Sequence, residues 1–397
     1  MYPLTLSRFT LTTCLGVGLE PNRQAIVAGR SGLTRLRIDD ADFETHIGEV
    51  SSLLEVRIPP SFSGWDCRNN RLAYTALQQD AFLDSVFQAA ALYGRGRIGV
   101  FIGTSTSGIR ETEEAFAHLD ANGSLPPSFE YRKTHACFSV ADFVRRLLKL
   151  EGPAFTVSTA CSSSAKVFPA AARMISSGLI DAAVVGGVDT LCRTTLFGFR
   201  SLELTALSAC KPFDVARSGI SIGEAGAFVL LERPGRSHAG SDLALFGAGE
   251  SSDAYHMSSP HPEGLGARIA IAAALEAARL SPEDIDYVNL HGTGTRTNDS
   301  AEDIAVVKTI GGKTPCSSTK GSTGHTLGAA GAVEIILSAL AIQEQIIPGG
   351  VTTEVTDPGL HCNFVRTPRP AGIRRVLSNS FGFGGSNCAL IIGRATN

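Results

Sequence analysis

Short apolar runs alternate with longer stretches of helical periodicity along the chain. In the first half, runs of apolar and β-branched residues bounded by glycine, proline or charged residues predict buried strands at 97–102, 153–157, 181–185 and 226–231. The third of these strands is expected to end at the glycine pair 186–187. An alanine-rich stretch at 161–177 predicts a helix directly after the second strand. This alternation favours an α/β protein with a parallel or mixed sheet covered by helices.

The second half repeats this organisation. Its pattern predicts helices at 267–279, 301–310 and 326–345, and strands at 286–290, 375–378 and 388–392. In both halves a turn of small residues precedes an apolar helix, at 156–161 and at 316–320. We therefore expect a duplicated fold with an N-terminal half at 1–235 and a C-terminal half at 236–397, joined by a Gly/Ser/Arg-rich stretch near 234–242. The alternative is that the halves are not duplicated, because α/β proteins in general have a repetitive sequence pattern.

The composition narrows the class of protein. Of the 397 residues, 43% are hydrophobic and 18% are charged, which indicates a globular protein with a large core. The formal net charge of -3 offers no basic surplus for nucleic acid. The nine cysteines contain no CxxC pair, so neither a zinc site nor a disulfide framework is expected. Since the sequence shows no signal-peptide pattern and no apolar stretch judged long enough to cross a bilayer, we expect a cytoplasmic protein without membrane contact.

Three turns rich in Gly, Ser, Thr and Ala carry the candidate chemistry. Cys161 lies in the turn 157–164, His291 in the turn 289–295, and Lys320 and His325 in the turn 320–328. A cysteine at the start of a helix is expected to favour the thiolate, because unpaired N–H groups and the helix dipole stabilise negative charge there. Two histidines can hold and polarise a thioester carbonyl. The combination indicates carbon–carbon bond formation on an acylated cysteine.

Each of these residues also has a structural interpretation. A free cysteine is commonly a small core residue, which is what we expect of the other eight. A single histidine is more often structural than catalytic, and a metal site lacks a third ligand at suitable spacing. The segment 382–387, Gly-Phe-Gly-Gly-Ser-Asn, could suggest a phosphate loop, but it lacks the Walker lysine and a following helix. A flexible turn beside the active site is the favoured interpretation of that segment.

Taken together, the turns resemble those of the β-ketoacyl-acyl-carrier-protein synthases, the ketosynthases of the thiolase superfamily. The resemblance covers nearly the whole chain and rests on four motifs in order, at 159–164, 291–295, 320–325 and 379–387. It implies a thiolase-like five-layered αβαβα fold made of two similar halves and normally dimeric. It also implies a decarboxylative Claisen condensation between a cysteine-bound acyl chain and malonyl-acyl-carrier protein.

The resemblance assigns the reacting groups. Cys161 would take the acyl chain, and the backbone N–H groups of Cys161 and Phe383 would form the oxyanion hole. His291 and His325 would hold the malonyl thioester carbonyl as carbon dioxide leaves. Lys320 would orient His325 and tune the charge of the site.

Further residues would support these groups. Glu334 falls where the family keeps a supporting carboxylate, and Thr293 and Thr295 would bind the phosphopantetheine arm of the carrier. No resident cofactor is implied, because the substrates arrive on that arm. One departure concerns Ile220, where fatty-acid enzymes usually place phenylalanine, so gating by paired aromatics is in doubt.

The partners and the pathway follow from the same resemblance. An acyl carrier protein is the expected substrate carrier, with Arg68 and Arg71 as candidate docking residues because carriers are acidic. The chain is expected to form a homodimer, or a heterodimer with a chain-length factor, through a segment at 129–140 that crosses the interface. The mixture of polyketide-like and fatty-acid-like motifs suggests a discrete synthase of a polyketide or aryl-polyene-like pathway. A non-catalytic chain-length factor and a cysteine hydrolase are the competing interpretations.

Overall fold

The computed structural model describes residues 2–38, 43–235 and 241–395. Its largest element is a mixed sheet with the strand order β14-β12-β11-β16-β17-β10-β1-β9-β7-β5-β6. Strand β1 (Leu4–Thr13) lies where two sets of strands meet, because it pairs along most of its length with β9 and only at Leu4 and Thr5 with β10. The sheet therefore consists of two halves joined through one short contact.

Each half of the sheet combines parallel and antiparallel strands. In the N-terminal half, β5 pairs in parallel with β6 and β7, whereas β9 is antiparallel to both β7 and β1. The strands of this half are β5 (Ile98–Gly103), β6 (Ala154–Val157), β7 (Ala182–Asp189) and β9 (Ala225–Glu232). The strands of the C-terminal half are β10 (Leu243–Ser252), β11 (Tyr287–Asn289), β12 (Pro315–Ser317), β14 (Asn363–Phe364), β16 (Arg375–Gly382) and β17 (Ser386–Arg394).

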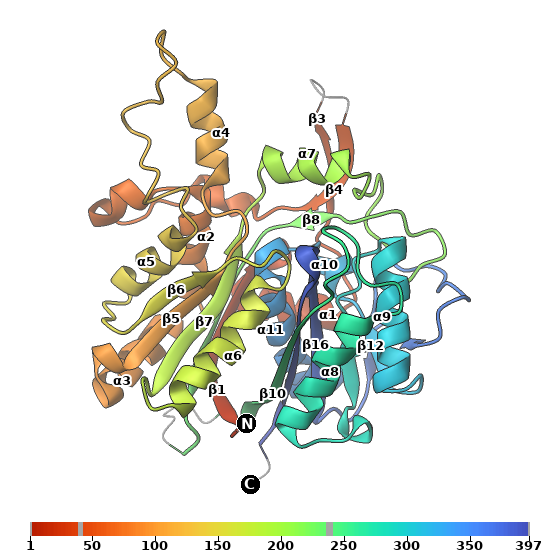
Figure 1. The fold of residues 1–397 in the computed structure, drawn as a ribbon. Helices are drawn as coiled ribbons and strands as arrows, with labels where there is room; N and C mark the ends of the chain where they lie inside the picture. Colours follow the sequence, from red (N-terminus) through yellow and green to blue (C-terminus); the bar gives the residue numbers. More distant parts are fainter. Residues whose placement is uncertain (1, 39–42, 236–240, 396–397) are drawn as a thin grey trace.

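Helices form the remaining three layers (Figure 1). Two helices, α6 (Ser163–Ser176) and α11 (Ala330–Glu344), contact each other and strands of both halves, so they form the central layer. The outer layer of the N-terminal half consists of α2 (Arg68–Leu77), α3 (Phe82–Tyr93) and α5 (Phe138–Leu147). The outer layer of the C-terminal half consists of α8 (Leu265–Ala278) and α9 (Arg296–Thr309). The order helix, sheet, helix, sheet, helix confirms the predicted five-layered thiolase-like fold.

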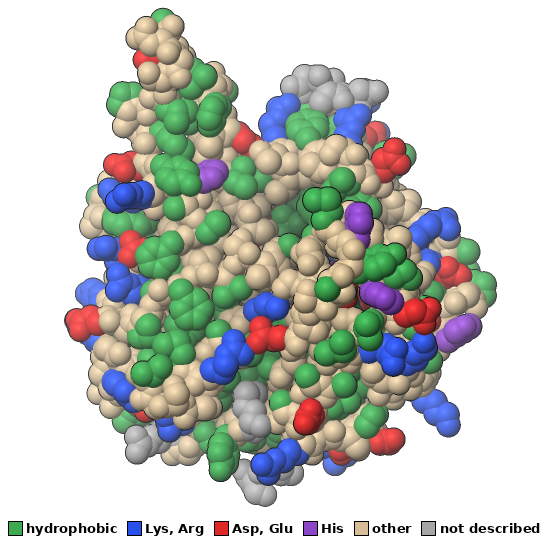
Figure 2. Space-filling model, viewed as in Figure 1, with side chains coloured by type: hydrophobic (Ala, Val, Ile, Leu, Met, Phe, Trp, Pro, Cys, Tyr) green, Lys and Arg blue, Asp and Glu red, His purple; other side chains and the backbone are tan. Residues whose placement is uncertain are grey.

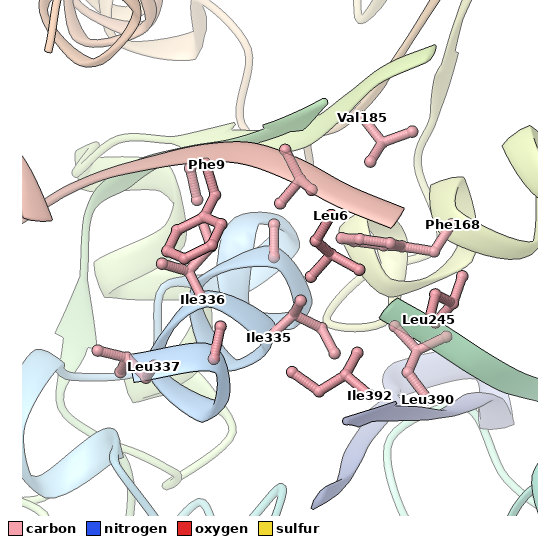
Figure 3. Close-up of a cluster of buried hydrophobic side chains, with 14 of the residues drawn as sticks. Leu6, Phe9, Phe168, Val185, Leu245, Ile335, Ile336, Leu337, Leu390 and Ile392 are labelled. Atoms are coloured by element: carbon pink, nitrogen blue, oxygen red, sulfur yellow. The ribbon is translucent and has the colours of Figure 1, made fainter. Parts of the chain in front are cut away.

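The largest cluster of buried hydrophobic side chains lies between the two halves. Its members come from both sides of the chain, as the close-up shows for Leu6, Phe168, Val185, Ile335 and Leu390 (Figure 3). Burial of such side chains supplies roughly 25 cal/mol per Å² of apolar surface removed from water. The segment Leu327–Glu344 is long and apolar enough to cross a membrane, contrary to the expectation from sequence, but 89% of it is buried inside the fold. It is therefore a core helix here.

Smaller elements lie around the sheet. The helices and 3-10 turns are α1 (Leu19–Val27), η2 (Ser51–Leu54), η3 (Pro60–Trp65), η4 (Arg95–Arg97), α4 (Ile109–Ala117), α7 (Arg193–Ser201), η5 (Pro282–Asp284), α10 (Lys320–Thr323), η6 (Leu327–Ala329) and η7 (Phe383–Gly385). The short strands are β2 (Gly16–Val17), β3 (Thr34–Ile38), β4 (Phe43–Gly48), β8 (Ile222–Gly223), β13 (Ile346–Ile347) and β15 (Arg369–Pro370). The helix α4 and the loop after it project from the body of the molecule (Figure 1).

Several predicted boundaries need correction. Strand β7 runs through the glycine pair to Asp189, because both glycines keep their pairing with β5 and β9. A glycine at 187 is required by close packing, since a Cβ there would lie 2.6 Å from the Ser164 Cβ and 2.8 Å from the Ala329 Cα. Helix α9 begins at Arg296, five residues before its apolar stretch, because polar residues occupy its first turn. The expected division at 235/236 falls beside residues 236–240, which lie outside the described residues.

Candidate active site

The first candidate residue, Cys161, lies in a sharp turn between β6 and α6. Ala160 has a φ of 52°, a left-handed conformation that is strained for any residue with a Cβ. The turn is held locally: the Thr159 N–H donates to Ser163 Oγ at 2.9 Å, and Ser163 Oγ donates to the Ala160 carbonyl. Helix α6 begins at Ser163 rather than at Cys161 as predicted, so the cysteine precedes the helix and presents its thiol to the interior of the molecule.

Burial dominates the chemistry of this thiol. It raises the pKa of Cys161 to about 11, against the positive charge of Lys320 and the backbone N–H of Phe383, both of which favour the thiolate. Nearby groups thus favour the thiolate, but desolvation outweighs them, so Cys161 rests as the thiol. The Phe383 N–H thus lies close to the Cys161 sulfur, and its part in an oxyanion hole stays a prediction.

Two histidines face Cys161. The thiol sulfur and one ring nitrogen from each of His291 and His325 all lie within 4.8 Å of one another. The two imidazole rings are 5.2 Å apart and nearly perpendicular, at 84°. Burial lowers the pKa of both histidines well below 6.5, and the charge of Lys320 acts in the same direction, so both rings are neutral at neutral pH.

Hydrogen bonds determine which ring nitrogen carries the proton. The Leu327 N–H donates to His325 Nδ1 at 3.3 Å, which assigns the proton to Nε2. The His325 Nε2 is buried and has no hydrogen-bond partner among the described residues. The Lys320 ammonium lies 3.3 Å from His291 Nδ1, which assigns the His291 proton to Nε2 as well. Both rings can therefore donate a hydrogen bond from Nε2.

Lys320 belongs to a buried charged pair. Its Nζ donates to Glu334 Oε1 and to the His291 carbonyl oxygen, and both side chains of the ion pair are almost fully buried. Burial raises the pKa of Glu334 to about 7, while Lys320 opposes that shift. The prediction that Lys320 orients His325 is corrected, because its hydrogen bonds reach His291 and the Leu327 N–H orients His325.

A metal site must also be considered, because Cys161, His291 and His325 lie close enough together to hold an ion. The spacing in the sequence did not reveal that three possible ligands meet here. However, coordination through Nε2 would require the proton to move to Nδ1, where the Leu327 N–H and the Lys320 ammonium already donate. The Lys320 charge opposes a cation at the same place. The arrangement suits an oxygen atom with developing negative charge better than a metal ion.

A carboxylate that the sequence analysis missed holds the His291 turn. Glu302, on α9, accepts the N–H groups of His291 and Gly292 at 2.7 Å each, and Asn379 Nδ2 donates to it at 3.1 Å. Burial raises the pKa of Glu302 to about 7. No clear signal in the sequence marked it, since α9 also buries Asp299 and Asp303.

The reacting groups open into a pocket lined by residues of both halves of the chain. Thr293 and Thr295 line it, and their hydroxyl oxygens are 3.0 Å apart. Ile220, the departure noted in the sequence, lines it as well. An aromatic pair still exists in the lining, because the rings of Phe199 and Phe383 are 5.7 Å apart. The other lining residues are Cys161, Leu204, Asp253, Ser258, Ser259, Pro260, His291, Thr297, Asn298, His325, Phe381, Gly382, Gly385 and Asn387.

The glycine-rich segment 382–387 forms the tight connection between β16 and β17 beside this pocket. Its backbone is anchored, since the Gly384 N–H donates to the Met257 carbonyl at 2.7 Å and the Asp253 N–H donates to the Gly385 carbonyl at 2.9 Å. The expected place of this turn beside the active site is confirmed.

One of the two arginines expected to dock a carrier is not available. Arg68 is 4% exposed and donates to both carboxylate oxygens of Glu224, through Nε at 2.9 Å and through a second nitrogen at 2.5 Å. A buried ion pair of this kind is structural, so that prediction is wrong for Arg68. Arg71 is partly exposed and paired with Asp66 at 2.6 Å. The face of α2 that carries Arg68 is a buried face, which the charge pattern alone did not show.

Six of the eight residues proposed from sequence line one pocket. Lys320 lies behind it against His291, and Glu334 is paired with Lys320. A buried cysteine in a strand–helix turn, facing two neutral histidines in a five-layered fold, defines an acyl-transferring enzyme of the thiolase type. The chain matches the N-terminal domain of β-ketoacyl synthases over residues 9–235 and the C-terminal domain over residues 244–354. The chain therefore belongs to the β-ketoacyl synthase family.

Known proteins support this assignment along the whole chain. The 3-oxoacyl-[acyl-carrier-protein] synthase 2 of Mycobacterium leprae is 35% identical over 98% of this chain and 96% of its own. The corresponding protein of Coxiella burnetii is 33% identical over 96% and 95%. A solved structure of the ketosynthase ApeO with its chain length factor ApeC, from Xenorhabdus doucetiae, matches with a TM-score of 0.92 and 40% identity, over 99% of this chain and 98% of that chain.

Proposed function

We propose that Cys161 carries the acyl chain and that His291 and His325 drive decarboxylation of the extender. In the first step the Cys161 sulfur forms a bond to the acyl carbon, and the carrier thiol leaves with a proton. In the second, the bond between the malonyl carboxylate and its α-carbon breaks, carbon dioxide leaves, and the electron pair moves onto the thioester oxygen. The α-carbon then attacks the acyl carbon on Cys161. The bond between that acyl carbon and the Cys161 sulfur breaks, and Cys161 leaves as the thiolate.

One observation carries this assignment. The buried Nε2 of His325, to which the proton is assigned, has no partner among the described residues, and His325 and His291 both line the pocket. An unpaired buried donor is costly unless a ligand satisfies it. The enolate oxygen formed on loss of carbon dioxide is the acceptor that two such donors would stabilise.

The substrates are proposed to arrive on an acyl carrier protein, so no resident cofactor is needed. Thr293 and Thr295 place two hydroxyl groups on the pocket wall, where they can bind the amides of a phosphopantetheine arm. Three further groups would complete the balance of charge around Cys161, and these are Lys320, Glu334 and the Phe383 N–H. Such a reaction fits a cytoplasmic enzyme without nucleic acid or membrane as partner.

We further propose that the active form is a dimer, with a chain-length factor as the partner. The 40% identity to a chain of the ApeO–ApeC complex supports the heteromeric form and a polyene or polyketide pathway. In the segment 129–140, Tyr131 is 57% and Phe138 45% exposed in the single chain. Hydrophobic side chains also cover much of the projecting arm that begins with α4 (Figure 2). A partner that buries these groups stabilises the assembly.

The test uses a carrier protein whose pantetheine ends in an electrophile that alkylates thiols. The expected product is a one-to-one covalent complex with the chain, joined at Cys161. Cys161→Ala should give none, Thr293→Val should slow its formation, and Cys362→Ala is the matched control, because Cys362 is a buried cysteine outside the pocket. Crosslinking that persists in Cys161→Ala, or that is lost in Cys362→Ala, would contradict the proposal.

A further inference from the structure

A fully buried aspartate that the mechanism above does not use lies between the two halves of the site. Asp189 is the last residue of β7 and is 0% exposed. Its Oδ1 accepts the hydroxyl of Thr104 at 2.6 Å and the N–H of Thr106 at 2.9 Å. The loop 104–106 follows β5, so this carboxylate fixes the end of β5. Strand β5 pairs with β6, and β6 leads to Cys161.

The second carboxylate oxygen reaches into the other half of the protein. The Gly328 N–H donates to Asp189 Oδ2 at 2.6 Å, and the Ser105 hydroxyl donates to the same oxygen at 2.6 Å. The approach is close enough to require glycine, because a Cβ at 328 would lie 2.7 Å from Oδ2 and 2.8 Å from the Ser105 nitrogen. Asp189 therefore ties the segment just after His325 to the N-terminal half.

That segment determines the orientation of His325. Leu327 has a φ of 52°, a left-handed conformation that a leucine rarely adopts. In this conformation its N–H points back at His325 Nδ1, 3.3 Å away, and the next N–H points at Asp189. Local hydrogen bonds from the Ala330 N–H to the Leu327 carbonyl and from the Ala329 N–H to the Thr326 carbonyl close this turn. The contact of the Gly328 N–H with Asp189 and the packing of the buried Leu327 side chain hold the strained residue against the N-terminal half.

We infer that Asp189 is a positioning residue for decarboxylation. Asp189 accepts the Gly328 N–H and thereby keeps Leu327 in the left-handed conformation. In this conformation the Leu327 N–H donates to His325 Nδ1, so the His325 proton stays on Nε2. The inference rests on the proposed function, because it assigns Asp189 a larger effect on the step that His325 serves than on acyl loading of Cys161.

The test compares Asp189→Asn with Asp286→Asn. Asp286 also accepts two backbone N–H groups, from Arg374 and Arg375, but it precedes β11 at the end away from His291. Two quantities are measured: the ratio of malonyl-carrier decarboxylation to acylation of Cys161, and the tautomer of His325 by 15N spectra of histidine-labelled protein, assigned with His325→Gln. Asp189→Asn should lower the ratio at least about tenfold and move the His325 signals toward the Nδ1–H form. Asp286→Asn should change neither.

A folded Asp189→Asn protein with an unchanged ratio and an unchanged His325 signal would overturn the inference. So would a wild-type protein whose His325 carries its proton on Nδ1. Should Asp189→Asn fail to fold, Gly328→Ala separates the same two groups from the other side and should give the same two changes. A wild-type enzyme that does not decarboxylate malonyl carrier would refute the proposed function, whereas the tautomer comparison would still decide whether Asp189 positions His325.

Discussion

The ammonium group of Lys320 lies 3.3 Å from His291 Nδ1 and also pairs with the buried carboxylate of Glu334. This contact keeps His291 neutral, with its proton on Nε2, because a cation beside the ring opposes a second proton. The Leu327 N–H likewise keeps the His325 proton on Nε2. Both histidines are therefore hydrogen-bond donors at Nε2 rather than bases.

Removal of the Lys320 charge should therefore impair decarboxylation. Lys320→Ala leaves His291 free to take either tautomer and leaves Glu334 without its partner, so we expect the decarboxylation rate to fall by about tenfold to a hundredfold. Release of carbon dioxide from malonyl carrier measures it. Lys313→Ala is the control, because Lys313 is exposed. A Lys320→Ala enzyme as fast as the control would contradict this role.

The two histidines should affect the two half-reactions unequally. His291→Ala and His325→Ala each remove a donor to the enolate oxygen, so each should reduce decarboxylation far more than acyl transfer to Cys161. Rates of carbon dioxide release and of mass gain on the protein give the two values. Equal losses in both half-reactions would show that the division of labour is wrong.

Loss of the nucleophile should have the opposite effect. Cys161→Ala should abolish acyl loading and leave malonyl decarboxylation, since the donors on His291 and His325 do not depend on the sulfur. Radiolabelled acyl chain that still attaches covalently to the variant would rule out Cys161 as the acyl carrier site.

Alkylation of Cys161 should be strongly pH-dependent. With a pKa of about 11, the thiolate fraction rises about tenfold per pH unit throughout the neutral range. The rate of inactivation by iodoacetamide should therefore keep rising between about pH 7 and pH 9 without a plateau. A plateau reached below pH 8 would mean a thiolate at rest, as the helix-start argument alone predicts.

Stability should respond to pH through Glu302. Its pKa is raised from 4.5 to about 7 by burial, so the protonated form is favoured on folding and the contribution to stability is lost as the pH rises through 7. Relative to Glu302→Gln, the wild-type free energy of unfolding should fall by a few kcal/mol between about pH 5 and pH 8. Urea unfolding of both proteins at the two pH values measures this. A constant difference between them would contradict the raised pKa.

Periodicity and motif order predicted most of the fold and the residues that meet at the site. The apolar runs found β5, β6, β9 and β17, because buried strands need continuous apolar sequence. The glycine pair before Asp189 misled the analysis, since glycine permits helix–strand packing as well as turns. Periodicity placed the start of α11 at 326, but a 3-10 turn precedes the helix, which begins at Ala330.

The finer properties of the site depend on tertiary contacts that no local pattern encodes. The pKa of Cys161 depends on burial by both halves of the chain, which outweighs the local helix effect. Arg68 is neutralised by Glu224, which lies 156 positions away in the chain. Glu302 and Asp189 orient the catalytic turns through backbone donors, and backbone donors leave no trace in the sequence.

One measurement tests the central claim most directly. The chain, with a chain-length factor if one is needed for activity, is incubated with an acyl carrier and a malonyl carrier labelled with 13C at the α-carbon, and the carrier-bound products are identified by mass. The account predicts a β-keto product two carbons longer than the acyl donor that retains the label, together with one carbon dioxide per product and none of this product with Cys161→Ala. Release of free acid without chain extension, or extension that persists in Cys161→Ala, would contradict it.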